Sequence, residues 1–148
     1  MIYIAGPFST EQERASLEKM ITLVRKRYPL EDLYIPMDFK VEGDFQKLDG
    51  TWNLPNHEWA KKVYEADVEH LLSSRMVFAM YCGRIHSSGS IWEIGYACGK
   101  EIPVILYIPK WASNEMSLMV LNGVYGYIDE NSMIYPFTPK LLKSFNQK

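Results

Sequence analysis

Two short runs of nearly uninterrupted apolar residues constrain the fold more than any other feature of this chain. They are MVFAMY, at positions 76–81, and PVILYI, at positions 103–108. Runs of this length and composition are typical of parallel strands that are buried on both faces. The run IYIA at positions 2–5, ended by Gly6-Pro7, predicts a similar strand at the start.

Helical patterns separate these apolar runs. Ser9 or Thr10, with Gln12 or Glu13 three residues later, predicts the start of a long first helix. We expect further helices at 56–73, 90–99 and 114–121 and after 136, and further strands at 33–36 and 124–128. Strands that alternate with helices imply right-handed crossovers and a parallel sheet covered on both faces. We therefore predict a flavodoxin-like α/β fold, a three-layer sandwich with a five-stranded parallel sheet, formed by a single domain over residues 1–148.

In such a fold, ligands bind beyond the carboxyl ends of the strands, near the point where the strand order reverses. These ends should carry residues 6–9, the segment from 37 onward, and residues 82–90. The connection at 37–54 is long, has no clear period and contains three aromatic residues. Long connections in compact domains are usually lids, binding loops or disordered segments, and here we favour a lid.

Composition excludes several classes of function. A formal net charge of −2 gives no general attraction to nucleic acid or to anionic membranes. Cys82 and Cys98 are too few for a disulfide framework, so free thiols in a reducing compartment are expected. The three histidines share no metal-ligand spacing. Without a basic-then-apolar leader or an apolar run of membrane-spanning length, we expect a cytoplasmic domain.

The stretch HSSGSIWEIGYA, at positions 86–97, places Glu93 near the start of the expected short helix. Within it, SIWE is a capping-box pattern in which the Glu93 carboxylate would bond back to the Ser90 backbone N–H. The helix dipole should keep this carboxylate ionised. Ionisation suits a cap and a nucleophile equally well, so the pattern alone leaves both roles open.

Other candidate residues also have two interpretations. Ser87, Ser88 and Gly89 precede the short helix and could form an anion pocket or simply a polar turn. Asp67 lies at the edge of an apolar helical stripe, where a carboxylate is more often solvated or paired with a lysine than catalytic. Tyr3, in the first expected strand, would usually belong to the core, with its hydroxyl finding some partner.

Four segments together resemble the nucleoside 2-deoxyribosyltransferases. They are IYIAGPF at the start, WAKKVYEADVEHL before the central strand, SSGSIWEIGYACGKEIPVILY after it, and SLM near the end. The similarity runs in order from Ile2 to about Ile128, and the G-S-I-W-E-I-G block is fairly specific. A shorter GT-x-x-E-like block would not suffice, because the cytokinin-activating phosphoribohydrolases carry a comparable one.

The resemblance implies cleavage of the N-glycosidic bond of a 2'-deoxynucleoside with retention, and transfer of the deoxyribosyl group to another nucleobase. Glu93 matches the family's nucleophile, which forms a covalent 2-deoxyribosyl ester. Asp67 matches an acidic residue that assists at the sugar, and Tyr3 matches the tyrosine that orients the nucleophile. Phe8 matches an aromatic residue near the base. The resemblance implies no metal or organic cofactor.

The chain departs from the family pattern at three positions. Ser87 replaces an aspartate that handles the proton of the base, Ser117 replaces an asparagine contributed by a neighbouring subunit, and Lys40 replaces a glutamine that contacts the base. Serine cannot act as a general acid near neutral pH, so the leaving-group proton must come from elsewhere or its transfer must be weaker. The related 2'-deoxynucleoside 5'-monophosphate N-hydrolases have serines at the first two positions, where both hydroxyls bind the 5'-phosphate. Their opening loop, however, carries an arginine that AGPFST lacks.

Three functions therefore remain open: a deoxyribosyltransferase, a 2'-deoxynucleoside 5'-monophosphate N-hydrolase with water as acceptor, and a nucleotide-binding module without turnover. The expected partners are small-molecule deoxynucleosides or deoxynucleotides and nucleobases. The expected substrate-binding residues are Gly6, Phe8, Ser9, Lys40, Ser87, Ser88, Gly89, Ser117 and Met119. If Ser117 completes a neighbour's site, the protein is a homo-oligomer with shared active sites and an apolar interface at 116–121. Otherwise this apolar face packs within its own domain.

Overall fold

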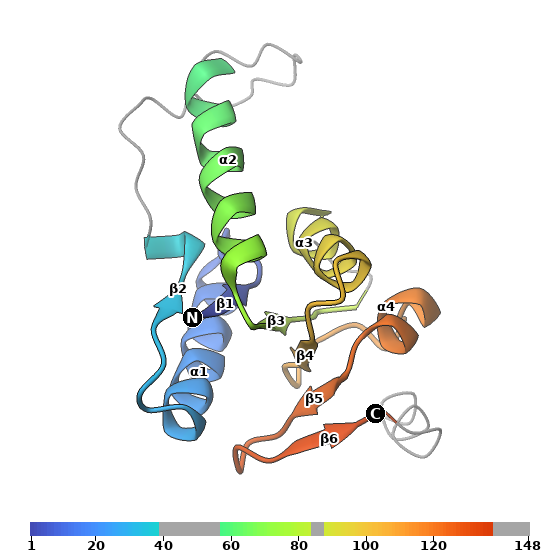
Figure 1. Ribbon diagram of the computed structural model, residues 1–148. Helices are drawn as coiled ribbons and strands as arrows, with labels where there is room; N and C mark the ends of the chain where they lie inside the picture. The colour runs from blue at the N-terminus through green and yellow to red at the C-terminus, as the bar shows by residue number, and fades with distance from the viewer. Residues whose placement is uncertain (39–56, 84–87, 138–148) are drawn as a thin grey trace.

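The computed structural model describes residues 1–38, 57–83 and 88–137 (Figure 1). The helices in these ranges are α1 (Glu11–Arg27), α2 (His57–Ser73), α3 (Ser88–Gly99) and α4 (Leu118–Gly123), with a short 3-10 helix, η1 (Pro36–Asp38). The strands are β1 (Ile2–Ala5), β2 (Leu33–Tyr34), β3 (Met76–Met80), β4 (Val104–Tyr107), β5 (Gly126–Ile128) and β6 (Ile134–Pro136).

These strands form one six-stranded sheet in the order β2-β1-β3-β4-β5-β6. The first five are parallel, and β6 pairs antiparallel with β5. The predicted flavodoxin-like α/β class and its five parallel strands are confirmed. The order reverses between β1 and β3, and in open sheets of this kind the crevice for ligands lies at that reversal.

The sequence patterns do not predict β6. This strand is only three residues long and ends at a proline, so it carries little periodic signal. It returns beside β5 through a tight turn in which Asp129 Oδ1 accepts hydrogen bonds from the N–H groups of Asn131 and Met133, at 2.9 and 3.0 Å. The helix expected after Pro136 lies outside the described residues.

Alternate residues of each strand face opposite sides of the sheet, because side chains alternate along an extended chain. Ile2 and Ile4 pack on the face covered by α1, whereas Tyr3 and Ala5 face the other helices. The residues with which α1 covers its face are Leu17, Met20, Ile21 and Val24. On the opposite face, α2, α3 and α4 contribute Leu71, Ile94, Ala97, Val120 and Leu121. Tyr3 is thereby directed towards the side of the sheet where α2 and α3 lie next to each other (Figure 1).

The first residues of the helices decide which residue caps α1 and whether Ser90 caps α3. Thr10 caps α1, with Glu13 completing the reciprocal capping box. The capping box expected at Ser90 does not form, because α3 begins at Ser88 and Ser90 already lies within its first turn. The helix predicted at 114–121 begins four residues later than expected, at Leu118, with Ser117 as its N-cap. Within the described ranges, no helix combines the length and apolar character needed to cross a bilayer.

Candidate active site

Two tyrosines on neighbouring strands hold two carboxylates at the carboxyl-terminal side of the sheet. Tyr3 in β1 and Tyr34 in β2 are register partners, and their ring centroids lie 5.3 Å apart. The Tyr3 hydroxyl donates a hydrogen bond to Glu93 Oε1 at 3.3 Å, and the Tyr34 hydroxyl donates one to Asp67 Oδ1 at 2.8 Å. The strand pairing therefore brings together two acidic residues from different helices.

Asp67 approaches this centre from α2 and Glu93 from α3. The sequence leaves open that the Asp67 carboxylate is solvated or paired with a lysine. In the structure it accepts a hydrogen bond from the hydroxyl of Tyr34. The sequence also leaves open that the Glu93 carboxylate bonds back to the Ser90 backbone. In the structure it accepts a hydrogen bond from the hydroxyl of Tyr3. Both carboxylates are thus turned towards the strands and the space between the helices.

Two hollows meet at Glu93. The first, which we call the aromatic hollow, is a cavity of about 290 Å³ between α2 and α3. Its lining residues are Tyr3, Tyr64, Asp67, Val68, Leu71, Gly89, Trp92 and Glu93. The second, which we call the loop hollow, is a cavity of about 610 Å³ beside the β1–α1 connection. Its lining residues are Gly6, Pro7, Phe8, Ser9, Thr10, Glu13, Ser88, Gly89, Ser90 and Glu93. Glu93 and Gly89 contribute to both cavities.

Burial raises the pKa of both carboxyl groups, and for Glu93 repulsion from Asp67 adds to this effect. Burial is the larger cause for Glu93, the nearby Asp67 adds to it, and the Tyr3 hydrogen bond opposes it; together they raise the pKa of Glu93 to about 7. Burial likewise raises the pKa of Asp67, opposed by its bond to Tyr34 and by His70. Desolvation thus opposes the ionisation that the helix dipole is expected to favour at Glu93.

The β1–α1 connection forms one wall of the loop hollow and is fixed by contacts with α1 and β3. A Cβ atom at Gly6 would lie 2.7 Å from Leu17 Cδ1 and 3.1 Å from Met80 Cβ, so a larger residue at this position would require the side chains of Leu17 and Met80 to shift. Arg14 then holds the loop by donating to the carbonyl oxygens of Phe8 and Ser9, both at 3.0 Å. Phe8, 41% exposed, lies at the edge of the hollow.

The remaining predicted site residues fall into three groups. In the first, Gly89 lines both hollows and Ser88 lines the loop hollow, next to Glu93. Ser87 and Lys40, and the proposed lid beyond Asp38, lie outside the described residues.

Ser117 and Met119 are not among the residues that line either hollow. The Ser117 hydroxyl caps α4 by accepting a hydrogen bond from the Val120 N–H at 3.4 Å, and the Ser117 N–H donates to the Tyr81 hydroxyl at 2.8 Å. Met119 is 84% exposed and its neighbour Leu118 is 70% exposed, whereas Val120 and Leu121 are buried. The apolar face at 116–121 is therefore divided between the core and the surface.

Sequence reasoning missed four aromatic residues of the site. Tyr34 and His70 lie behind Asp67, and Tyr64 and Trp92 form walls of the aromatic hollow. Trp92 belongs to the G-S-I-W-E-I-G block, so this motif could have identified it as a residue of the site. The other three depend on strand register and helix packing. No group of three or more His, Cys, Asp or Glu side chains in the described part of the chain is arranged to hold a metal ion.

Comparisons with known proteins point to one family. Residues 2–132 match the family model described as nucleoside 2-deoxyribosyltransferase. A nucleoside deoxyribosyltransferase from Lactobacillus johnsonii is 25% identical over 135 residues, covering 90% of each chain. Another, from Limosilactobacillus fermentum, is 26% identical over 148 residues, covering 98% of this chain and 84% of that protein.

Among solved structures, a 2-deoxyribosyltransferase from Bacillus psychrosaccharolyticus is similar with a TM-score of 0.75 and 21% identity. That similarity covers 93% of this chain and 98% of the other. A conserved protein from Enterococcus faecalis is similar with a TM-score of 0.57 and 23% identity, covering 99% of this chain and 85% of the other. Both similarities concern the fold.

Proposed function

The chain belongs to the nucleoside 2-deoxyribosyltransferase family, and we propose that it cleaves the N-glycosidic bond of 2'-deoxynucleosides through a covalent intermediate on Glu93. The observation that carries this proposal is the position of Glu93. Its carboxylate is held by the Tyr3 hydroxyl at the junction of two cavities, where a sugar can present its anomeric carbon. Because Tyr3 engages Oε1, Oε2 is the oxygen proposed to attack.

The reaction proceeds in two displacements at C1' of the deoxyribose. In the first, Glu93 Oε2 forms a bond to C1' while the C1'–N bond breaks, and its electron pair leaves with the base, which takes up one proton. In the second, a ring nitrogen of an incoming base attacks C1' and gives up its proton, the ester C–O bond breaks, and the Glu93 carboxylate is regenerated. Two inversions at C1' give net retention.

Asp67 has an electrostatic part in this scheme. Both displacements pass through a transition state in which positive charge develops on the sugar ring. A carboxylate fixed beside the reacting centre stabilises that charge, and does so more strongly in a partly desolvated site. In the same position Asp67 raises the pKa of Glu93. Asp67 therefore disfavours the ionised form of the nucleophile while it stabilises the positive charge that develops on the sugar.

A second candidate function is N-hydrolysis of 2'-deoxynucleoside 5'-monophosphates, with water in place of the acceptor base. The observation that favours it is the lining of the loop hollow, which includes hydroxyl residues Ser9, Thr10, Ser88 and Ser90 beside the N-terminus of α3. Hydroxyls and free N–H groups at a helix N-terminus suit a phosphate. In this candidate, Ser87 and the Ser117 of a second copy hold the 5'-phosphate.

We further propose that the protein is a homo-oligomer with shared active sites. Leu118 and Met119 are exposed apolar side chains directly after Ser117, and they lie outside the cavities of their own chain. Burial of such side chains against a second copy would remove apolar surface from water and would deliver Ser117 to a neighbouring site.

One experiment tests the proposed activity against its alternatives. The protein is incubated with thymidine or with dTMP, each with and without free adenine, and the products are separated. Deoxyadenosine compounds formed in the presence of adenine support transfer. Free thymine formed from dTMP without an acceptor supports hydrolysis. Binding with neither product would leave a non-catalytic module, and substantial turnover by Glu93→Ala would contradict the covalent role of Glu93.

A further inference from the structure

We propose that Tyr34 is a positioning residue for Asp67, acting on that carboxylate as Tyr3 acts on Glu93. This inference rests on the proposed function only for its catalytic consequence. The hydrogen bond and the orientation that it imposes can be tested without substrate.

The first support is geometric. Tyr3 and Tyr34 are Cα partners in parallel strands, so their side chains leave the sheet on the same face. Each hydroxyl reaches one carboxylate, and the bond from Tyr34 to Asp67 Oδ1, at 2.8 Å, is the shorter of the two. Because Oδ1 is engaged by Tyr34, Oδ2 is the oxygen that can face a bound sugar.

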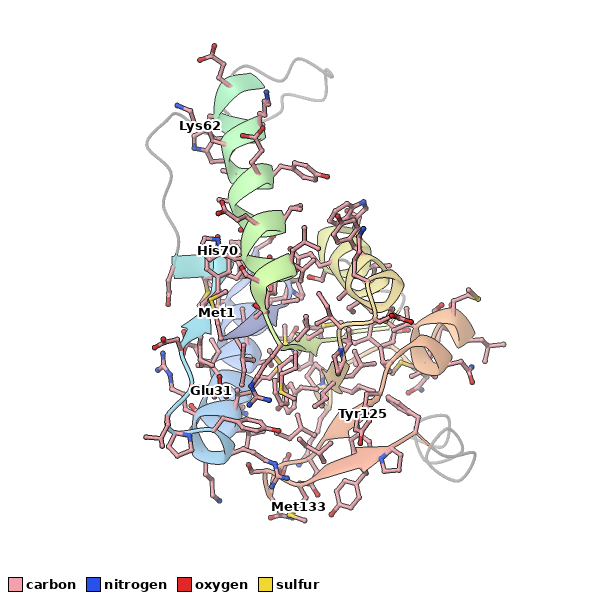
Figure 2. The ribbon with its side chains drawn as sticks, in the orientation of Figure 1. Met1, Glu31, Lys62, His70, Tyr125 and Met133 are labelled. Atoms are coloured by element: carbon pink, nitrogen blue, oxygen red, sulfur yellow. The ribbon has the colours of Figure 1, made fainter. Side chains whose placement is uncertain are left out.

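The second support is that the Tyr34 ring is itself fixed. Its ring stacks on His70, with centroids 3.9 Å apart and planes 13° apart, and Tyr34 is only 8% exposed. His70 is held in turn, because its Nδ1 lies 2.7 Å from the carbonyl oxygen of Ala66 one turn earlier in α2, and a ring nitrogen in that contact must donate. Figure 2 labels His70 on the side of α2 that faces β2. A fixed donor restricts the rotamer of the carboxylate that it binds.

The third support is the charge balance around Asp67. The titratable groups that face it are Tyr3 and Tyr34 from the strands, Glu93 from α3 and His70 from its own helix. The O–H of Tyr34 donates to the ionised carboxylate and so lowers the pKa of Asp67, against the larger effect of burial. Without that donor, Asp67 would bind a proton at higher pH.

The test compares Tyr34→Phe with the wild type by ¹³C NMR of protein labelled at the aspartate carboxyl carbons, with Asp67→Asn used for assignment. Tyr34→Phe keeps the ring stacked on His70 and removes only the donor. We expect the titration midpoint of Asp67 to rise by about one pH unit. Tyr107→Phe, a buried strand tyrosine in β4 outside both hollows, is the matched control and should leave Asp67 unchanged. An Asp67 midpoint in Tyr34→Phe equal to that of the wild type would overturn the inference.

A second measurement asks whether the orientation matters for the reaction. We expect kcat of Tyr34→Phe to fall about tenfold with KM nearly unchanged, since a misplaced group costs rate rather than binding. A shifted Asp67 titration with unchanged kcat would overturn the positioning role and leave the proposed function intact. A wild-type protein without glycosidic cleavage would reject the proposed function and the catalytic consequence, while the titration still reports on the hydrogen bond.

Discussion

The hydroxyl of Tyr3 donates to Glu93 Oε1 across 3.3 Å, although the two residues are ninety positions apart in the chain. Tyr3 is completely buried in β1, whereas Glu93 faces two cavities from α3. The bond therefore connects the rigid centre of the sheet to the carboxylate on which the proposed reaction depends. A group held in this way is restricted in orientation, and its surroundings shift its pKa.

The first prediction concerns that bond. Tyr3→Phe removes a donor that lowers the pKa of Glu93, so the pKa should rise above about 7 and kcat/KM at neutral pH should fall about tenfold. The pH dependence of kcat/KM measures both effects. Because part of the loss comes from protonation, activity should partly recover at higher pH. A uniform loss at every pH would show that the Tyr3 hydroxyl orients Glu93 without lowering its pKa.

The second prediction is the pH profile of the wild-type enzyme. A nucleophilic carboxylate must be ionised, and the pKa of Glu93 is about 7. We therefore expect kcat/KM to rise with pH through about 7 and to fall about tenfold per unit on the acid side. An acid limb near the ordinary glutamate pKa of about 4.3 would mean that the free enzyme does not keep Glu93 in this environment.

The third prediction concerns stability. The pKa of Glu93 is raised from 4.5 to about 7 in the folded protein, so its contribution to stability is fully present below pH 4.5 and is lost as the pH rises through about 7. Glu93→Gln removes this ionisation. We expect it to increase the free energy of unfolding on the order of 2 kcal/mol above pH 7, after allowance for partial exposure, with little change near pH 4.5.

Urea denaturation at the two pH values measures this difference. Glu65→Gln is the matched control, because Glu65 lies on α2 with its side chain 58% exposed and forms a surface ion pair with Lys61 at 3.6 Å. Its effect should be a few tenths of a kcal/mol at either pH. A Glu93→Gln protein that is less stable than the wild type at high pH would show that burial does not disfavour the ionised Glu93 carboxylate.

Particular residues show how far the sequence alone predicts this molecule. The apolar runs that become β3 and β4 indicate the sheet directly, because strands buried on both faces must be apolar. The role of Glu93 is more difficult to predict, because the sequence SIWE at positions 90–93 is compatible with a capping box and with a carboxylate that faces a pocket. The choice depends on where α3 begins, and helix boundaries are the weakest part of any such pattern.

Tyr34 shows what local patterns cannot predict. Its role depends on the register between β1 and β2 and on the angle at which α2 passes the sheet, and both arise from packing between distant segments. The raised pKa of Glu93 has the same origin. A dipole can be predicted from one helix, but the burial that opposes it depends on the whole arrangement of α2, α3 and β1.

The fourth prediction separates nucleosides from nucleotides. If Ser87 binds a 5'-phosphate, Ser87→Ala should reduce kcat/KM for dTMP by about tenfold or more and leave thymidine nearly unaffected, since a hydrogen bond to a charged group contributes about 1.5–3 kcal/mol. Steady-state kinetics with the two substrates give the ratio. Ser73→Ala, at an exposed position at the end of α2, is the control. Equal losses for both substrates would remove the phosphate role of Ser87.

The fifth prediction concerns assembly. Met119→Lys places a charge on an apolar side chain that is 84% exposed in the isolated chain. If a second copy covers Met119, the charge must be desolvated there, so the oligomer should dissociate. Size-exclusion chromatography with light scattering should then give a lower mass, and activity should fall about tenfold or more because Ser117 no longer reaches the neighbouring site.

Leu30→Lys is the matched control for assembly, because Leu30 is 99% exposed and lies in the turn between α1 and β2, away from α4. It introduces the same charge without touching the proposed interface, and mass and activity should stay at wild-type values. A Met119→Lys protein that is monomeric and fully active would contradict shared active sites, since each chain would then hold every group that the reaction needs. An unchanged mass would place Met119 outside the interface and would remove the argument that its exposure marks a subunit contact.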